Sequence, residues 1–120
     1  MLIQKLSNIP PLNLPHLKKL YLHHNNISKI EGLEGCAELK ELYLFSNHIE
    51  DIDGLSNQGS LQQLWLQENS ISSVSGVLSL NSLRSLHLAG NKVYFAITSN
   101  MQHPFEACEK EINLDTYQFS

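Results

Sequence analysis

Residues 17–36 read LKKLYLHHNNISKIEGLEGC, and the spacing of their apolar residues decides the fold. Leu20 and Leu22 alternate around Tyr21, a pattern typical of a short strand with one buried face. The residues after Leu22 follow neither the 3.6-residue period of an amphipathic helix nor the alternation of a long strand. The stretch therefore predicts a short strand, an inward bend at Asn25 and an irregular return segment.

This pattern occurs four times along the chain, with a constant period of 22 residues. The copies are LKKLYLHHNNI at 17–27, LKELYLFSNHI at 39–49, LQQLWLQENSI at 61–71 and LRSLHLAGNKV at 83–93. Three Leu positions and one Asn position are the same in every copy, and the last position is Ile or Val. A fixed period of this length indicates a solenoid, whose successive coils bury their apolar faces against one another.

The four copies resemble the leucine-rich repeat, in its short 22-residue class. That class includes the leucine-rich regulatory subunit of protein phosphatase 1 and the leucine-rich light chain of axonemal dynein. The resemblance implies an α/β fold: a right-handed leucine-rich repeat solenoid with a short parallel β-sheet on its concave face. Each return segment has few residues, which predicts 3₁₀ or extended structure on the convex face.

The Asn of each copy is expected to be buried at the bend. An Asn side chain can bond to the backbone groups that a bend exposes, so the four residues should form a ladder bonded to neighbouring coils. These residues are Asn25, Asn47, Asn69 and Asn91.

The return segments carry apolar residues and a glycine at a constant phase. We expect tight turns or a positive φ at Gly32, Gly54 and Gly76. Cys36 stands at an apolar position and is predicted to be a small buried residue rather than a nucleophile. Gln58 stands at the equivalent position one copy later and is expected to reach solvent or a backbone group.

The chain divides into three parts. Residues 1–16 are predicted to form a degenerate N-terminal half repeat, 17–93 the four repeats, and 94–120 a divergent C-terminal cap or tail. The spacing of apolar residues at 3–6 echoes that at 27–30. This echo places residues 3–6 on a return segment and predicts that the strand of this coil is missing.

The C-terminal part departs from the pattern of the family. A helix starting after Pro104 would place Phe105, Cys108 and Ile112 on one face, where it could cover the fourth repeat. Related proteins often end in a cap with a Tyr-Arg pair, which is absent here. Two alternatives follow: a divergent cap, or a fragment or alternative product of a longer repeat protein.

Composition limits the classes of function. The chain has 120 residues and a net charge of -4, and only 8 of its residues are Lys or Arg, which argues against a general grip on nucleic acid. Apolar runs stay well below the ~18 residues of a membrane span, and the first residues do not form a signal peptide. Cys36 and Cys108 lie far apart, so we expect reduced thiols in a cytoplasmic protein, with the nucleus, cytoskeleton or cilium as alternatives.

The outward strand positions predict a row of rings on the sheet. Tyr21, Tyr43, Trp65 and His87 recur at the 22-residue period, so stacked strands should place them side by side, about 4.8 Å apart. The outward positions beside them are Lys19, His23, Glu41, Phe45, Gln63, Gln67 and Glu68. Aromatic anchors are common in protein interfaces, whereas stacked rings can also serve only to stabilise the sheet. We expect these eleven residues to contact a partner protein.

Metal binding and catalysis find little support. His23 and His24 are adjacent, so in a strand they would point apart unless the following bend redirects them. No carboxylate or Cys completes a tetrahedral set at ligand spacing, and phosphate loops and nucleophile elbows are absent from the sequence. We therefore expect no cofactor, no metal and no small-molecule substrate.

The sequence predicts a non-enzymatic, monomeric protein-binding scaffold. The resemblance suggests a phosphatase, a dynein motor domain or another cytoskeletal protein as a client. Glu41 and Glu68 beside the rings favour a partner with basic residues. Three alternatives remain: an RNA-processing adaptor that binds an RNA-binding protein, direct nucleic-acid binding, and a structural segment of a longer repeat protein.

Overall fold

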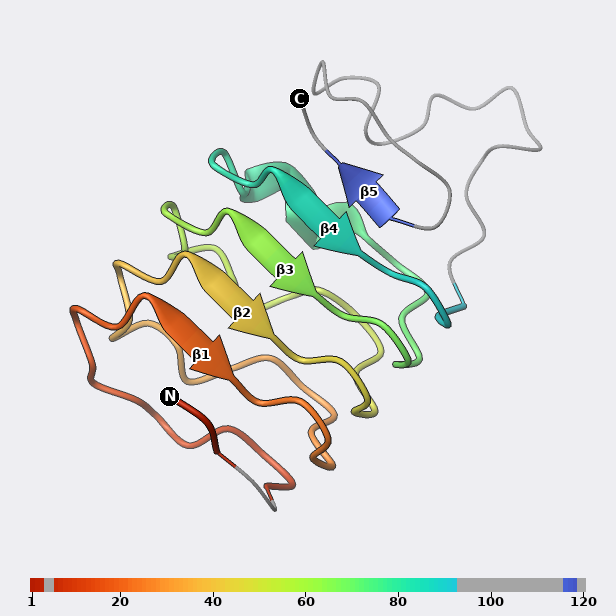
Figure 1. Ribbon diagram of the computed structural model, residues 1–120, viewed down its shortest axis with the longest axis horizontal. Helices are drawn as coiled ribbons and strands as arrows, with labels where there is room; N and C mark the ends of the chain where they lie inside the picture. Colours follow the sequence, from red (N-terminus) through yellow and green to blue (C-terminus); the bar gives the residue numbers. More distant parts are fainter. Residues whose placement is uncertain (4–5, 93–115, 119–120) are drawn as a thin grey trace.

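The computed structural model describes residues 1–3, 6–92 and 116–118. Five short strands form one sheet in the order β1-β2-β3-β4-β5, and the first four are parallel (Figure 1). Their bounds are β1 Lys19–Tyr21, β2 Glu41–Tyr43, β3 Gln63–Trp65, β4 Ser85–His87 and β5 Thr116–Gln118. No helix in the described residues is long and apolar enough to span a membrane.

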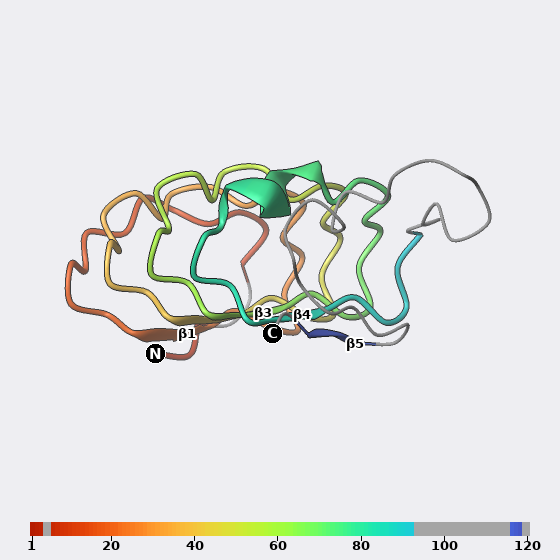
Figure 2. The same cartoon turned by 90° about the horizontal axis from the view of Figure 1, so that it is seen from above.

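The register of the parallel strands reproduces the sequence period. Leu20 lies opposite Leu42, Leu42 opposite Leu64, and Leu64 opposite Leu86. Each strand residue therefore pairs with the residue 22 positions later in the next strand. Figure 2 shows the strands along one wall and the return segments along the other. The 3₁₀ helix η1, Ser75–Ser79, lies on the return wall. The predicted leucine-rich repeat solenoid, an α/β fold with little helix, is confirmed.

The core fills the space between these two walls. Inward residues of the strands and of the return segments form one continuous apolar cluster, in which Leu20, Leu42, Leu64 and Leu86 are completely buried. Cys36 is also completely buried, in agreement with its predicted role as a small apolar residue. Each coil therefore gains its stability from apolar surface that only its neighbours cover.

The predicted asparagine ladder is present and links every coil to the one before it. The Asn47 side chain donates to Leu44 O in its own coil and to Leu22 O in the preceding coil, both at 3.0 Å. Its Oδ1 accepts the backbone N–H of Ile27 at 3.0 Å. Equivalent bonds are formed by Asn25, Asn69 and Asn91.

The residue before each Asn has a left-handed backbone, which the repeat pattern did not predict. The φ angles are 56° at His24, 58° at Ser46, 56° at Glu68 and 76° at Gly90. Non-glycine residues adopt this conformation at a cost of ~1–2 kcal/mol. The inward bend is therefore shared between a strained residue and the Asn that bonds the exposed backbone.

Residues 1–3 occupy the strand position of the first coil, so the prediction of a missing strand was wrong. Leu2 forms an isolated parallel bridge with Tyr21. The Tyr21 N–H donates to Met1 O at 2.6 Å, and the Ile3 N–H donates to Tyr21 O at 3.0 Å. These bonds extend the sheet past β1.

The hydrogen bonds of Asn25 show the correct phase of this coil. Asn25 donates to Ile3 O at 3.0 Å, in the way that Asn47 donates to Leu22 O, so Ile3 corresponds to Leu22 and not to Ile27. The error arose because the bend of this coil is two residues shorter than the others. Three positions separate Ile3 from Leu6, whereas five separate Leu22 from Ile27.

The other edge of the sheet carries a strand that was not predicted. β5 pairs antiparallel with β4, with Leu86 opposite Tyr117, and so gives the last parallel strand a partner. An unpaired edge exposes backbone N–H and C=O groups, and this pairing covers them. The predicted helix with Phe105, Cys108 and Ile112 lies outside the described residues.

Gln58 is a buried polar residue within the apolar cluster. It is 1% exposed, and its Nε2 donates to Leu33 O at 2.6 Å, which agrees with the expectation that it reaches a backbone group. Its Oε1 has no hydrogen-bond partner in the described structure. An unpaired buried acceptor destabilises the folded state by ~1–3 kcal/mol.

Gln58→Leu is therefore expected to raise the free energy of unfolding by about 1 kcal/mol. The change removes the unpaired Oε1, and Leu33 O keeps a bond from the Cys36 N–H at 3.0 Å. Chemical denaturation would measure the effect, with Gln62→Leu at a half-buried sheet position as control. A less stable Gln58→Leu protein would show that the amide contributes more than its unpaired oxygen costs.

Candidate protein-binding face

The sheet face is the side of β1–β4 that points away from the core, and a row of four rings runs across it. Tyr21 and Tyr43 stack at a centroid distance of 4.5 Å, Tyr43 and Trp65 at 5.5 Å, and Trp65 and His87 at 3.6 Å. The interplanar angles are 19°, 16° and 13°. The strand register brings these residues together as the 22-residue period predicted. We call this set the ring row.

The polar groups of two rings are bonded to the residues two positions earlier. The Tyr43 hydroxyl donates to Glu41 Oε1 at 2.6 Å, and the Trp65 Nε1–H donates to Gln63 Oε1 at 3.2 Å. Lys19 Nζ lies 3.3 Å from the other oxygen of Glu41. These bonds fix the tilt of the rings, because each side chain is held both by its neighbour's face and by its own strand.

A second aromatic cluster lies beside the ring row. His23 stacks on Phe45 at 4.5 Å, and His24 meets the same ring edge-to-face at 5.3 Å. The left-handed backbone at His24 turns its ring back toward His23, so the two histidines converge rather than point apart. Sequence reasoning left His24 out of the candidate site, and its position before Asn25 was the available signal.

The remaining predicted site residues lie at the end of the strands. Gln67 is half-buried, and its Oε1 is buried without a partner in the described structure. Glu68 is exposed, and its carboxylate lies next to Gly90, where a Cβ would come within 2.7 Å of it. A larger residue at this position would require the Glu68 side chain to move.

Burial changes the proton affinity of several groups on the face. Burial lowers the pKa of His87, and burial together with the charge of His24 lowers the pKa of His23. His23 Nδ1 is also buried without a partner in the described structure, so a proton there would find no acceptor. The hydrogen bond from Tyr43 lowers the pKa of Glu41, and burial followed by the bond to Glu41 raises the pKa of Tyr43.

Stability should consequently fall as the solution becomes acidic. Because the folded chain binds protons at His23 and His87 less readily than the unfolded chain, their contribution is fully present above the unfolded pKa of ~6.5 and is lost as pH falls below it through the lower pKa values of the folded chain. We expect a lower unfolding temperature at about pH 5.5 than at about pH 7.5. The double variant His23→Gln, His87→Gln should reduce this dependence, whereas His48→Gln, an exposed control, should keep it. Equal pH dependence in both variants would contradict the prediction.

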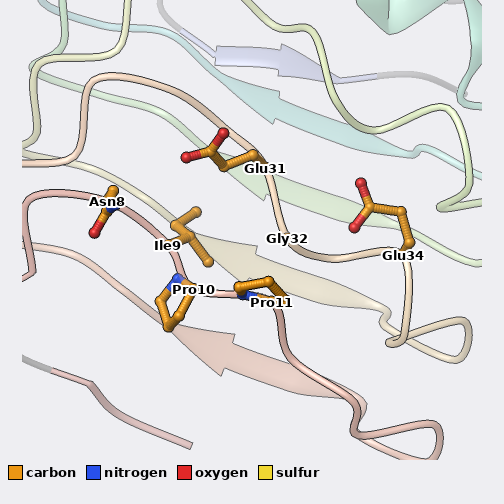
Figure 3. Close-up of a pocket in the computed structure, with 7 residues that line it drawn as sticks. All are labelled: Asn8, Ile9, Pro10, Pro11, Glu31, Gly32 and Glu34. Atoms are coloured by element: carbon orange, nitrogen blue, oxygen red, sulfur yellow. The ribbon is translucent and has the colours of Figure 1, made fainter.

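A shallow depression of about 520 Å³ lies on the return wall, away from the sheet face (Figure 3). Its lining residues are Asn8, Ile9, Pro10, Pro11, Glu31, Gly32 and Glu34. They share no residue with the ring row, and they include no histidine or cysteine. In the part of the chain that the structure describes, no group of three His, Cys, Asp or Glu side chains could hold a metal ion.

The 22-residue coils, the parallel strands and the asparagine ladder define a leucine-rich repeat solenoid. Residues 15–57 match the family model described as leucine-rich repeats in two copies. The chain therefore contains leucine-rich repeats by both sequence and fold.

Two solved structures of bacterial internalins are similar to the chain. Internalin C2 from Listeria monocytogenes strain 4b F2365 is 33% identical, with a TM-score of 0.63, over 70% of this chain and 38% of that chain. The internalin InlF from the same strain is 26% identical, with a TM-score of 0.55, over 64% of this chain and 22% of that chain. The chain thus spans less than half the length of either internalin. A comparison with curated proteins gave no significant match.

Proposed function

We propose that the chain is a non-enzymatic scaffold that docks a partner protein on its sheet face. The observation that carries this proposal is the ring row, four aromatic side chains held in one line by stacking and by bonds to Glu41 and Gln63. Aromatic side chains are frequent hot spots, since they offer a large contact area.

Preorganisation makes this row suited to binding. Association costs ~0.5–1.5 kcal/mol for each flexible side chain that must be immobilised. Tyr43 and Trp65 are already fixed on both sides by neighbouring rings, so a partner meets a surface that needs little further ordering. The similar fold of the internalins supports a role in protein interaction.

The finer predictions stay as proposals of ours. A phosphatase or a cytoskeletal motor protein as client, a cytoplasmic location and a monomeric state come from the resemblance and the composition. A structural segment without a partner site is the principal competing function. It would use the stacked rings to stabilise the sheet and nothing more.

Trp65→Ala and Tyr43→Ala decide between these two functions. Affinity capture from cell extract, read by mass spectrometry, should lose the specific partner with either variant. Leu78→Ala is the matched control, because Leu78 is an exposed apolar residue on η1, on the opposite wall. If folded ring variants still captured the same partner, the proposed binding role of the ring row would be wrong. The rings would then serve only to stabilise the sheet.

A further inference from the structure

Three cations line the edge of the sheet face where the strands begin. Lys18, Lys40 and Arg84 each stand directly before a strand, with Gln62 in the corresponding place before β3. The N–H of Lys40 donates to Lys18 O, that of Gln62 to Lys40 O and that of Arg84 to Gln62 O, each at 2.8 Å. These bonds place the four residues in one column, parallel to the ring row. We call the three cations the basic rim.

The basic rim is available for a partner. All three side chains are exposed. The ion pairs found in the described residues join Lys19 to Glu41 and His16 to Glu38, and none involves the rim.

The carboxylates of the described chain lie mostly elsewhere. Glu31 and Glu34 border the depression on the return wall (Figure 3), and Glu50, Asp51 and Asp53 belong to the next return segment. Among the described residues, these return segments are thus rich in carboxylates, whereas Lys18, Lys40 and Arg84 stand at the strand starts together with Glu38, which pairs with His16. This separation changes the expectation from sequence, which favoured a basic partner because of Glu41 and Glu68.

Glu41 gives little support to a basic partner once its contacts are known. Both of its oxygens are engaged, one by the Tyr43 hydroxyl and the other near Lys19 Nζ, and its pKa is lowered by the first of these contacts. Glu68 remains the exposed carboxylate at the far end of the strands. At the strand starts the carboxylates nearest in sequence to the rim are Glu41, which is engaged as described, and Glu38, which pairs with His16, whereas the three cations form no ion pair within the described residues.

The orientation of the rings favours a peptide over a nucleic acid as the partner. Tyr43 and Trp65 each stack on a ring at both faces, so neither has a free face on which a nucleobase could stack. A partner meets the ring edges instead, and these carry the positive side of the aromatic quadrupole. Ring edges beside ammonium and guanidinium groups favour oxygen acceptors together with apolar side chains.

We propose that the partner binds this face through an acidic amphipathic peptide segment, whose carboxylates lie along the basic rim and whose apolar side chains cover the ring row. The inference rests on the proposed function and specifies its partner class. Charge complementarity of this kind accelerates association and fixes orientation. Four strands span about 14 Å, which matches about ten residues of helix.

Fluorescence anisotropy at low ionic strength tests the proposal with three labelled probes. They are a peptide of about 12 residues with equal numbers of Leu and Glu, the same peptide with Lys in place of Glu, and a thymidine oligonucleotide of equal length. The acidic peptide should bind most tightly. The double variant Lys40→Glu, Arg84→Glu should weaken it roughly tenfold, because it replaces two attractions by repulsions. The double variant Lys29→Glu, Lys92→Glu makes the same change in net charge away from the rim and should leave binding unchanged.

Several outcomes would overturn the inference. Tighter binding of the basic peptide or of the oligonucleotide would do so, as would equal losses in the rim and control variants. Trp65→Ala separates this inference from the proposed function. If it weakens the acidic peptide while the rim variant does not, the sheet face binds a partner and the basic rim is not involved. If neither variant has an effect, the inference fails, and the proposed function is then decided by the capture experiment with Trp65→Ala and Tyr43→Ala.

Discussion

Asn47→Asp is expected to lower the free energy of unfolding by more than ~3 kcal/mol at neutral pH, although it changes only one atom of the side chain. In place of an amide that donates to Leu22 O and Leu44 O at 3.0 Å, a carboxylate would face two carbonyl oxygens. Asn47 is 5% exposed, so water cannot screen this repulsion. Asn47→Ala should lose somewhat less, about 2–3 kcal/mol, because it only leaves the Ile27 N–H unpaired.

Chemical denaturation measures both effects, and acidification distinguishes their causes. Once protonated, the introduced carboxyl group could donate one hydrogen bond, so the deficit of Asn47→Asp relative to the parent should shrink as pH falls, while that of Asn47→Ala should not. Asn57→Asp is the control, since Asn57 is exposed on the following return segment. If Asn47→Asp were as stable as Asn57→Asp, the ladder would contribute far less to stability than its geometry indicates.

Gly76→Ala is expected to lower the free energy of unfolding by about 3 kcal/mol, for a steric reason. The backbone of Gly76 lies directly on the preceding coil, and a Cβ would overlap the Ile52 carbonyl oxygen. Backbone atoms cannot move aside as the end of a long side chain can. The two coils would therefore have to separate along the return wall.

Gly59→Ala provides the matched control for this prediction. In the described structure no atom lies within 4 Å of the position that its Cβ would take. It should leave stability unchanged or raise it by up to about 1 kcal/mol, because alanine restricts the unfolded chain. Thermal unfolding of the two variants compares them directly. Similar unfolding temperatures would mean that the coils are packed less closely than the structure shows.

The repeat made the centre of the molecule predictable. A period of 22 residues fixes the strand register, and the register places Tyr21, Tyr43, Trp65 and His87 in one row. Bonding of the asparagines followed from the chemistry of their amides. The register depends on spacing and the ladder on the amide group, and both can be recognised in a single sequence.

Features that the identity of the residues does not signal were missed. Left-handed backbone before each Asn was hidden because His24, Ser46 and Glu68 are ordinary residues, and only Gly90 gave a signal. The N-terminal coil was assigned the wrong phase because its shortened bend imitates the spacing of a return segment. β5 carries no repeat pattern, so nothing in the sequence indicated its pairing with β4.

The positions of the rings were predicted, but the side-chain contacts around them were not. Sequence placed Glu41 beside the rings and treated it as a free charge. In the structure Tyr43 and Lys19 engage it, and the three cations of the basic rim form no ion pair within the described residues. Side-chain contacts of this kind depend on tilt and rotamer, which the repeat period does not determine.

The shared carbonyls of the asparagine ladder have a consequence for how such a chain can change in length. Leu44 O accepts from Asn47 of its own coil and from Asn69 of the next. Each pair of neighbouring 22-residue coils is joined by the same kind of bond, from an Asn side-chain amide to a Leu carbonyl. Inserting or removing a whole unit of 22 residues therefore leaves each remaining Leu carbonyl beside an Asn amide. Duplication of complete 22-residue units therefore lengthens the coil without disturbing the ladder, whereas the shorter N-terminal coil keeps the bond from Asn25 to Ile3 O only with a shortened bend.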